Sequence, residues 1–157
     1  MKKILITGGA GFIGSHLTDA FIKRGYQVVI IDNLSTGRLK NINLQAKFYK
    51  LDIQSKNLEE VFQTEKPDFV SHHAAQIDVR LSTMDPLLDA RINILGSLNL
   101  LNLCQKYKVK KIIFASSGGA MYGETKKIPT TETHPARAIS PYGIAKAVVE
   151  QYLYYFK

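Results

Sequence analysis

A glycine-rich turn, TGGAGFIG at Thr7–Gly14, joins the first apolar run of the chain to its first helical pattern. Its glycines recur three residues apart, at Gly8, Gly11 and Gly14. Gly8 permits a tight turn, Gly11 lets a phosphate approach the backbone, and Gly14 lets the helix pack close to the strand. The helix start then offers N–H groups and a partial positive charge to a pyrophosphate. The turn is therefore predicted to bind a dinucleotide, and a glycine-rich turn without a ligand is the alternative.

An acidic residue, Asp32, directly follows the next apolar run, Gln27–Ile31, where a dinucleotide site requires an acid. A carboxylate there accepts hydrogen bonds from the adenosine ribose hydroxyls and repels the additional phosphate of NADP. NAD is therefore the expected cofactor. Two alternatives stay open, because Arg38 lies nearby and would tolerate NADP, and Asp32 could serve only as a turn residue before Asn33.

Outward from this turn, strand-sized apolar runs alternate with helical patterns along the whole chain. Such alternation predicts parallel strands joined by right-handed crossovers, with helices on both faces of the sheet. The expected fold class is α/β, a Rossmann-like doubly wound parallel sheet in three αβα layers. The expected strands are Lys3–Thr7, Gln27–Ile31, Lys47–Leu51, Asp68–Ser71 and Lys111–Ala115, and the expected helices are Phe12–Arg24, Leu58–Thr64, Pro86–Tyr107 and one that begins at Pro141.

The length of 157 residues suffices for one domain with a hydrophobic core, and no internal repeat, low-complexity tract or linker divides the chain. We therefore expect a single domain over residues 1–157. No strand follows the helix that begins at Pro141, whereas a doubly wound sheet of this type normally has a sixth strand. The sequence is thus expected to be cut short before that strand.

The composition is that of a soluble globular protein, with 45% hydrophobic and 22% charged residues. The apolar runs are too short to span a bilayer, and the one after Lys3 is too short for a signal peptide. The single cysteine, Cys104, excludes an internal disulfide, so a cytoplasmic location is expected. The net charge of +8 comes from scattered lysines without a basic, aromatic-interleaved patch, so no nucleic-acid partner is expected.

A Tyr-x-x-x-Lys pair, Tyr142 and Lys146, lies near the start of the last predicted helix. Residues four apart share one face of a helix, so the ammonium would lie beside the phenol. A tyrosine is a weak base at neutral pH, and a neighbouring cation lowers its pKa. The pair is therefore a candidate for proton transfer, and a solvated helix face is the alternative.

The chain resembles, over its whole length, the extended short-chain dehydrogenase/reductase family, and within it the nucleotide-sugar epimerases such as the UDP-glucose 4-epimerases. The segments that carry the resemblance are Thr7–Leu17, Asp32–Gly37, Asp52–Ile53, His73–Ala75, Asn93, Ser116–Gly123 and Tyr142–Lys146.

The resemblance implies an NAD-dependent nucleotide-sugar epimerase, an isomerase of carbohydrate metabolism. Tyr142 would take the proton from the sugar 4-hydroxyl, and Lys146 would also hold the nicotinamide ribose. Hydride would pass from sugar C4 to NAD, giving a 4-keto intermediate, and would return to the other face. Asn93 would steady the active-site helix. The implied cofactor-binding residues are Gly8, Gly11, Phe12, Ile13, Gly14, Asp32, Asn33, Ser35, Thr36, Gly37, Asp52, Ile53, Ala74, Ala75, Gln76, Asn93, Tyr142 and Lys146.

One segment departs from the family pattern. The family usually places a catalytic Ser or Thr four residues before the tyrosine that here is Tyr122, and Gly118 occupies that position. Ser117 is therefore the expected third catalytic residue, acting from a shifted position, and a serine that merely terminates the fifth strand is the alternative. The related dehydratases carry Thr-Asp-Glu in this segment, where this chain has GGA at 118–120. Without those carboxyls, epimerisation is favoured over dehydration.

The resemblance also bears on partners and on completeness. A nucleotide sugar, most simply a UDP-sugar, is the implied substrate, and two long helices are expected to form a homodimer. The C-terminal part of the family, which grips the nucleotide sugar, is absent, so little turnover is expected from residues 1–157 alone. Another dehydratase, reductase or decarboxylase of the family and a non-catalytic NAD-binding module are the competing functions. No metal site is expected, because His72 and His73 lack convergent ligands.

Overall fold

A computed structural model describes residues 1–125 and 128–157. The chain divides into two compact units. One, the sheet unit, comprises Met1–Ala75 and Asn99–Ala115, and the other, the helical unit, comprises Gln76–Leu98 and Ser116–Lys157. Each unit is described by itself below.

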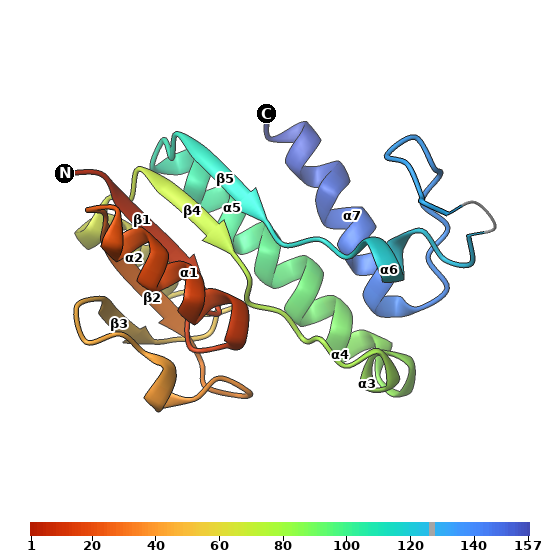
Figure 1. The fold of residues 1–157 in the computed structure, drawn as a ribbon, viewed down its shortest axis with the longest axis horizontal. Coiled ribbons are helices and arrows are strands. Elements are labelled where there is room, and N and C mark those ends of the chain that lie inside the picture. Colours follow the sequence, from red (N-terminus) through yellow and green to blue (C-terminus); the bar gives the residue numbers. More distant parts are fainter. Residues whose placement is uncertain (126–127) are drawn as a thin grey trace. The chain divides into compact units, whose positions relative to one another are not determined.

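The sheet unit contains five parallel strands in the order β3-β2-β1-β4-β5 (Figure 1). This confirms the expected parallel α/β sheet. In the register, Thr7 lies opposite both Ile31 and His72, so the carboxyl ends of the three central strands lie side by side. Loops that follow such strand ends carry the ligand sites of open α/β sheets. The strands are β1 (Lys3–Thr7), β2 (Gln27–Asp32), β3 (Lys47–Lys50), β4 (Phe69–His72) and β5 (Lys111–Phe114).

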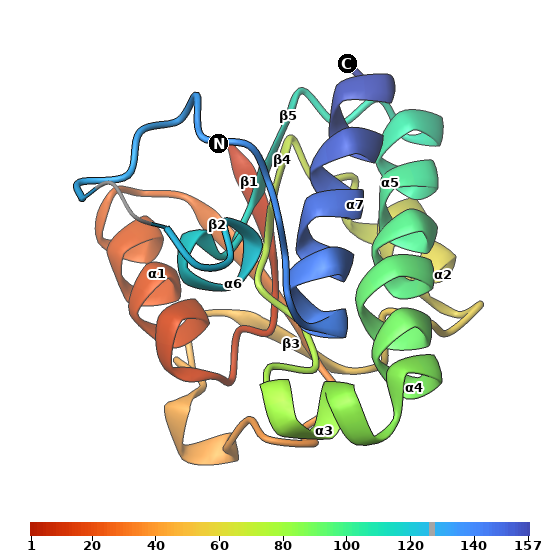
Figure 2. The same cartoon turned by 90° about the vertical axis from the view of Figure 1, so that its right-hand side faces the viewer.

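Helices cover both faces of this sheet because successive side chains of a strand point to opposite faces. Ile4 and Ile6 of β1 pack on the face covered by α1 (Phe12–Lys23), whereas Leu5 packs on the face covered by α2 (Leu58–Glu65) and α5 (Gly96–Lys106). Figure 2 shows α1 on one side of the strands with α2 and α5 on the other. A short 3₁₀ turn, η1 (Leu39–Asn41), follows β2.

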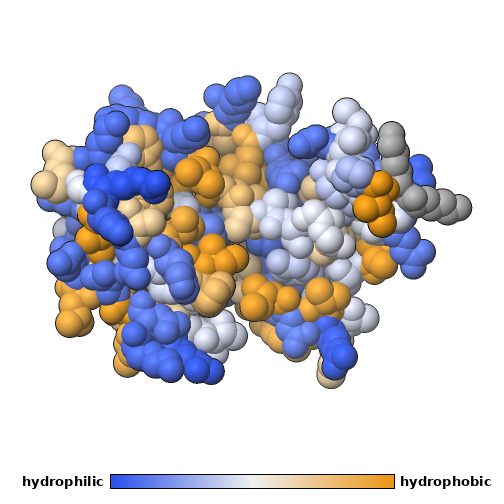
Figure 3. Space-filling view, in the orientation of Figure 1, coloured by the Kyte–Doolittle hydropathy of each residue, from blue (hydrophilic) through white to orange (hydrophobic). Residues whose placement is uncertain are grey.

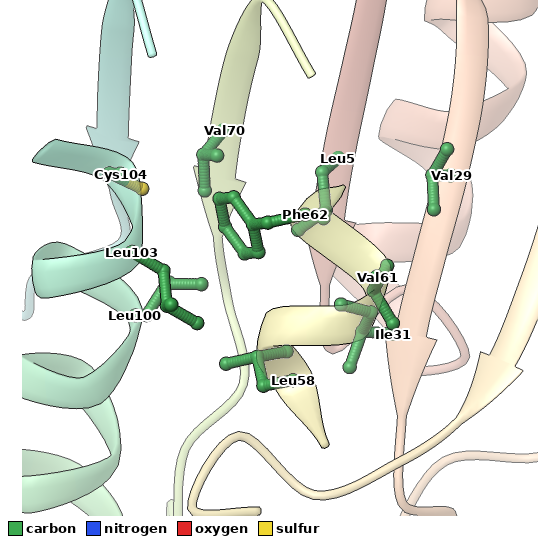
Figure 4. Packing of buried hydrophobic residues seen from close by; sticks show 10 residues of the cluster. All are labelled: Leu5, Val29, Ile31, Leu58, Val61, Phe62, Val70, Leu100, Leu103 and Cys104. Carbon is green, nitrogen blue, oxygen red and sulfur yellow. The ribbon is translucent and has the colours of Figure 1, made fainter. Parts of the chain in front are cut away.

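The core between the sheet and the helices α2 and α5 is apolar and fully buried. Phe62 of α2 has none of its surface exposed and lies among side chains from the strands and from α5 (Figure 4). The cluster contains Leu5, Val29, Ile31, Leu58, Val61, Phe62, Val70, Leu100, Leu103 and Cys104. Burial in this apolar surrounding raises the pKa of the Cys104 thiol to about 12, so little of the reactive thiolate forms at neutral pH.

The helical unit begins with two short helices that are capped by aspartates. Asp78 accepts hydrogen bonds from the backbone N–H groups of Arg80 and Leu81 at the start of α3 (Val79–Met84). Asp85 accepts from Leu88 N–H at the start of α4 (Pro86–Ala90), where proline occupies the first turn.

The single long helix expected over Pro86–Tyr107 is one helical path with a local change of winding. α4 is followed by a π-helical turn, η2 (Arg91–Leu95), and then by α5. The residues that flank the π turn, Ala90 and Gly96, keep right-handed helical angles. The hydrophobic spacing of a helix does not reveal such a turn, and π turns are frequent at functional sites.

The last two helices of the helical unit are α6 (Gly118–Met121) and α7 (Pro141–Tyr155). The Ser140 hydroxyl accepts from Gly143 N–H and caps α7, which begins at Pro141 as the sequence predicts. α3 and α6 were not expected, because each is too short to show a hydrophobic period. Within the part of the chain that is described, no helix is both long and apolar enough to cross a membrane.

Candidate functional site

The glycine turn after β1 is built as a cradle that excludes side chains. Gly8 has φ of 70°, and a Cβ there would lie 2.7 Å from the Ala74 backbone nitrogen. Its own N–H donates to the Ile31 carbonyl at 2.8 Å, which fastens the turn to the end of β2. A Cβ on Gly14 would lie 2.2 Å from the Gly8 carbonyl oxygen. Both glycines are therefore required by backbone packing alone.

Gly11 is less tightly enclosed than Gly8 and Gly14. Among the described residues, a Cβ there would meet the Gly8 carbonyl oxygen alone, at a tight 3.2 Å. Gly11 is the N-cap residue of α1, and the helix start carries no side-chain cap. The next two side chains, Phe12 and Ile13, are 78% and 58% exposed. An uncapped helix start over a glycine turn suits a pyrophosphate, which would take the place of the missing cap.

Asp32 fastens the glycine turn to the loop after β2. The carboxylate is buried, and Oδ2 accepts from Ala10 N–H at 3.0 Å while Oδ1 accepts from Leu34 N–H at 2.8 Å. A Cβ on Gly37 would lie 2.8 Å from Oδ1, so the loop returns close to the carboxylate. Each carboxylate oxygen has a second lone pair, so hydrogen bonds to a ribose remain compatible with these backbone contacts.

The loops that follow β2 and β3 meet through polar side chains. Asn33 Nδ2 donates to Asp52 Oδ2 at 2.7 Å, and Asn33 Oδ1 accepts from Ser35 N–H at 3.0 Å. Ile53, next to Asp52, is 4% exposed. The structure thus brings these sequence-predicted residues together, while Thr36 is exposed in the same loop.

Thr7, at the end of β1, is a site residue that sequence reasoning missed. Its buried hydroxyl lies 2.6 Å from His72 Nδ1 and accepts from the backbone N–H groups of His73 and Ala74, both at 3.2 Å. Thr7 therefore sets the position of the segment leading to the predicted residues Ala74 and Ala75. A threonine that ends a strand gives no signal by itself, but its place before the glycine turn does.

The second candidate group lies in the helical unit, around the start of α7. Tyr142 and Lys146 lie on one face of the helix, with Lys146 Nζ 5.6 Å from the centre of the Tyr142 ring. The Lys146 side chain is almost fully buried. Ser117 precedes α6, and its side chain lies close enough to the Tyr142 phenol to lower the pKa of that group. The structure therefore brings all three predicted catalytic residues together.

The electrostatics of this pair differ from the sequence expectation. Burial raises the pKa of Tyr142, and the proximity of Asp89 adds to it, while the hydrogen bond from Ser117 opposes the shift. Burial lowers the pKa of Lys146 to about 8, and the Asp89 carboxylate opposes this lowering. In the protein chain itself, burial thus raises the pKa of the phenol, whereas the sequence predicted that a neighbouring cation lowers it.

A closed polar network adjoins this pair in the same unit. Asn93, in the π turn, donates through Nδ2 to the Gln76 carbonyl and to Asp89 Oδ1, both at 2.9 Å, and accepts from Gln76 N–H at 2.8 Å. Gln76 Nε2 donates to the same Asp89 oxygen at 3.0 Å. Asn93 and Gln76 were predicted site residues, whereas Asp89 was missed because a lone acid in a helix carries no signal.

Backbone packing requires some of the glycines in and after α6 but not others. Gly123 has φ of 66°, and a Cβ there would lie 2.2 Å from the Arg137 carbonyl oxygen. Among the described residues, a Cβ on Gly119 would meet no atom within 4 Å, and one on Gly118 would meet only the Tyr122 ring, at 3.7 Å. The described part of the chain therefore does not crowd the glycines at 118 and 119, which follow Ser117.

Among the described residues, no cluster of three or more His, Cys, Asp or Glu side chains could hold a metal ion. The glycine turn, Asp32 and the Asn33–Asp52 pair belong to the sheet unit. Tyr142, Lys146 and Ser117 belong to the helical unit, together with Gln76 and Asn93.

Comparison with known proteins identifies relatives for the whole chain. Residues 4–157 match the model of the NAD dependent epimerase/dehydratase family. A UDP-glucose 4-epimerase from Mycolicibacterium smegmatis is 38% identical over 156 residues, covering 96% of this chain and 50% of the relative. The structure of a Thermotoga maritima UDP-glucose 4-epimerase with UDP-glucose superposes with a TM-score of 0.96 at 51% identity, covering 98% of this chain and 50% of that one.

A further structure, the Thermus thermophilus UDP-glucose 4-epimerase complex with NAD, has a TM-score of 0.95 at 45% identity and covers 98% of this chain and 50% of that one. The chain therefore spans about half the length of the curated relatives and solved structures that it matches.

Proposed function

Because the chain belongs to the NAD-dependent epimerase/dehydratase family, we propose that it is the NAD-binding and proton-transferring half of a UDP-sugar 4-epimerase. The observation that carries the proposal is the buried Lys146, whose Nζ lies 5.6 Å from the centre of the Tyr142 ring on the same face of α7. A phenol that lies beside an ammonium is equipped to accept a hydroxyl proton. The relatives named as UDP-glucose 4-epimerases support the reaction class.

The sheet unit fits NAD by its own geometry. The uncapped start of α1 at Gly11 suits the pyrophosphate, and the buried carboxylate of Asp32 suits the adenosine ribose and disfavours a 2′-phosphate. Asn33, Asp52 and the loop to Gly37 would flank the adenosine end. Ala74 and Ala75, which follow β4 in the same unit, would line the cofactor. When bound, NAD would supply the hydride acceptor.

In this proposal Tyr142 takes the proton from the sugar 4-hydroxyl and later returns it. Burial keeps the phenol protonated in the protein alone, so a positive charge close to it is needed before it can act as a base. Each unit of pKa lowering requires about 1.4 kcal/mol of interaction. Lys146 supplies part of that charge.

Epimerisation is proposed rather than dehydration, because GGA at 118–120 provides no carboxyl beside Ser117. The open space at Gly118 and Gly119 supports this choice, since a hexose that must present both faces of C4 needs room to turn. The nucleotide sugar itself is proposed from the UDP-sugar relatives.

A homodimer is proposed through the long helices, whose exposed apolar side chains include Leu87, Leu95 and Tyr155. Hydrophobic side chains are seen at the surface in Figure 3.

The function is tested with a chimera in which residues 1–157 replace the matching half of the Thermotoga maritima enzyme. We expect interconversion of UDP-galactose and UDP-glucose, and a loss of at least about 100-fold in kcat for Tyr142→Phe, because the general base is removed. Circular dichroism and NAD binding establish that the chimera and its Tyr142→Phe variant are folded. A folded chimera that binds NAD but interconverts no UDP-sugar would overturn the proposed reaction.

A further inference from the structure

Asp89 is a buried acid that the cofactor and proton-transfer residues do not include. Only 1% of its surface is exposed. A carboxylate in such a place is costly unless it is hydrogen-bonded and paired with a positive charge. The residues that meet this requirement indicate what Asp89 does.

Two amide groups fix the direction of the carboxylate. Asn93 Nδ2 and Gln76 Nε2 both donate to Oδ1, at 2.9 and 3.0 Å. Asn93 in turn holds the Gln76 backbone at both its N–H and its carbonyl, so the three residues form a closed triangle. The π turn from Arg91 to Leu95 places Asn93 in this triangle. The Asp89 carboxylate therefore has a preset orientation.

The positive charge that acts on this carboxylate is that of Lys146. α4, which carries Asp89, packs against α7, and the Lys146 side chain on α7 is 4% exposed. Arg80 of α3 and Arg91 of η2 are the other charged groups on the elements packed against α7, and both are exposed, while α6 has none. On α7 itself the titratable neighbours are Tyr142 and Glu150. Among the described residues, Asp89 is thus the buried carboxylate that acts on Lys146.

The attraction is mutual. Burial raises the pKa of Asp89, and the hydrogen bonds from Gln76 and Asn93 together with the charge of Lys146 lower it again. For Lys146, burial lowers the pKa to about 8, and Asp89 raises it. Asp89 also raises the pKa of Tyr142. The acid therefore favours an ammonium beside a neutral phenol.

We propose that Asp89 is a positioning residue, whose carboxylate, aimed by Gln76 and Asn93, holds the buried Lys146 ammonium in place and charged beside Tyr142. This inference rests on the proposed function for the catalytic meaning of the pair. Its structural content, a charge coupling between α4 and α7, stands without it. Asp89 acts through Lys146 and contacts no reacting atom.

The test is an NMR titration of the Lys146 side chain in the 157-residue protein, with Lys146→Arg used to assign the resonance. Asp89→Asn keeps the size and the acceptor oxygen but removes the charge. We expect the Lys146 pKa, about 8 in the wild type, to fall by about 1 unit in Asp89→Asn. Asp89→Glu, which restores a carboxylate, should return part of the shift. An unchanged Lys146 pKa in folded Asp89→Asn would overturn the proposal.

Two controls keep the result interpretable. Glu60→Gln removes one negative charge from an exposed position of α2 and should leave the Lys146 pKa unchanged. If Asp89→Asn does not fold, the wild-type Asp89 carboxyl carbon is followed instead, and its resonance should shift near pH 8 as Lys146 loses its proton. An Asp89 carboxyl resonance that does not shift near pH 8 would overturn the proposal. Neither titration needs NAD, so coupling without NAD binding would contradict only the proposed function.

Discussion

At the scale of single residues, the glycines of this chain fall into two kinds. Gly14 is demanded by the backbone, because a Cβ would lie 2.2 Å from the Gly8 carbonyl oxygen. Gly119 is not, because a Cβ there would meet no atom of the described residues within 4 Å.

This difference gives a matched pair of substitutions. Gly14→Ala should lower the free energy of unfolding by about 1–3 kcal/mol, because the turn must shift to admit the methyl group. Gly119→Ala should change it by less than about 0.5 kcal/mol. Urea denaturation measures both. Equal effects of the two substitutions would contradict the close approach of the Gly8 carbonyl oxygen to Gly14.

The buried Lys146 makes stability depend on pH. Its pKa is about 8 in the folded protein and 10.5 in the unfolded chain, so between these values the unfolded state binds more protons. The free energy of unfolding contributed by this residue therefore rises with pH from about 8 to 10, by up to about 1.4 kcal/mol per pH unit. Below pH 8 its destabilising effect is complete.

We expect Lys146→Met to lose this pH dependence, since methionine fills similar space without a charge. Urea denaturation of both proteins between pH 7 and 10 gives the difference, in which the opposing contribution of Cys104 cancels. A wild-type protein whose stability relative to Lys146→Met does not rise above pH 8 would show that Lys146 is not buried as a cation.

At the scale of elements, one carboxylate links a helix to two strands. Glu65, near the end of α2, pairs with Lys3 of β1 at 2.9 Å and with Lys47 of β3, and it accepts from the Tyr49 hydroxyl. β1 and β3 are the two neighbours of β2, so Glu65 spans the strand between them. Burial raises the pKa of Glu65, but the hydrogen bonds from Lys47, Tyr49 and Lys3 bring it down to about 2.

A lowered carboxyl pKa gives a defined acid sensitivity. The contribution of Glu65 is present above pH 4.5 and is lost as the pH falls towards 2. Glu65→Gln should therefore melt at a lower temperature than the wild type at pH 7 and at nearly the same temperature at pH 2. Thermal melts by circular dichroism measure this, and an equal deficit at both pH values would contradict the ionic role.

The elements also show what sequence can predict. All five strands and the helices from Phe12, Leu58 and Pro141 follow from periodicity and caps, because each packs one face on the sheet or on a neighbouring helix. α3 and α6 escape prediction because six and four residues hold too little of a hydrophobic period. The π turn escapes because the spacing of apolar side chains hardly changes across it.

The same limits apply to the site. Gly8, Gly14 and Asp32 could be predicted because their motif encodes a backbone geometry that the structure shows. Asp89 could not, because its importance lies in side chains that folding brings together around it. The raised pKa of Tyr142 also could not be predicted, since it depends on burial rather than on spacing.

At the scale of the whole molecule, the chain carries two candidate groups, one in each compact unit, and spans about half the length of its relatives. Binding of NAD requires mainly the sheet unit, whereas turnover requires a grip on the nucleotide sugar. We therefore expect residues 1–157 to bind NAD but to interconvert UDP-galactose and UDP-glucose only weakly.

The most direct measurement is the thermal stability of the protein with NAD and with NADP at equal concentrations. NAD at one hundred times its dissociation constant should add about 2.7 kcal/mol to the free energy of unfolding. NADP should add much less, because the Asp32 carboxylate repels its 2′-phosphate. A shift with NAD alone is the result we predict. No shift with either, or equal shifts with both, would contradict an NAD site built on the glycine turn and Asp32.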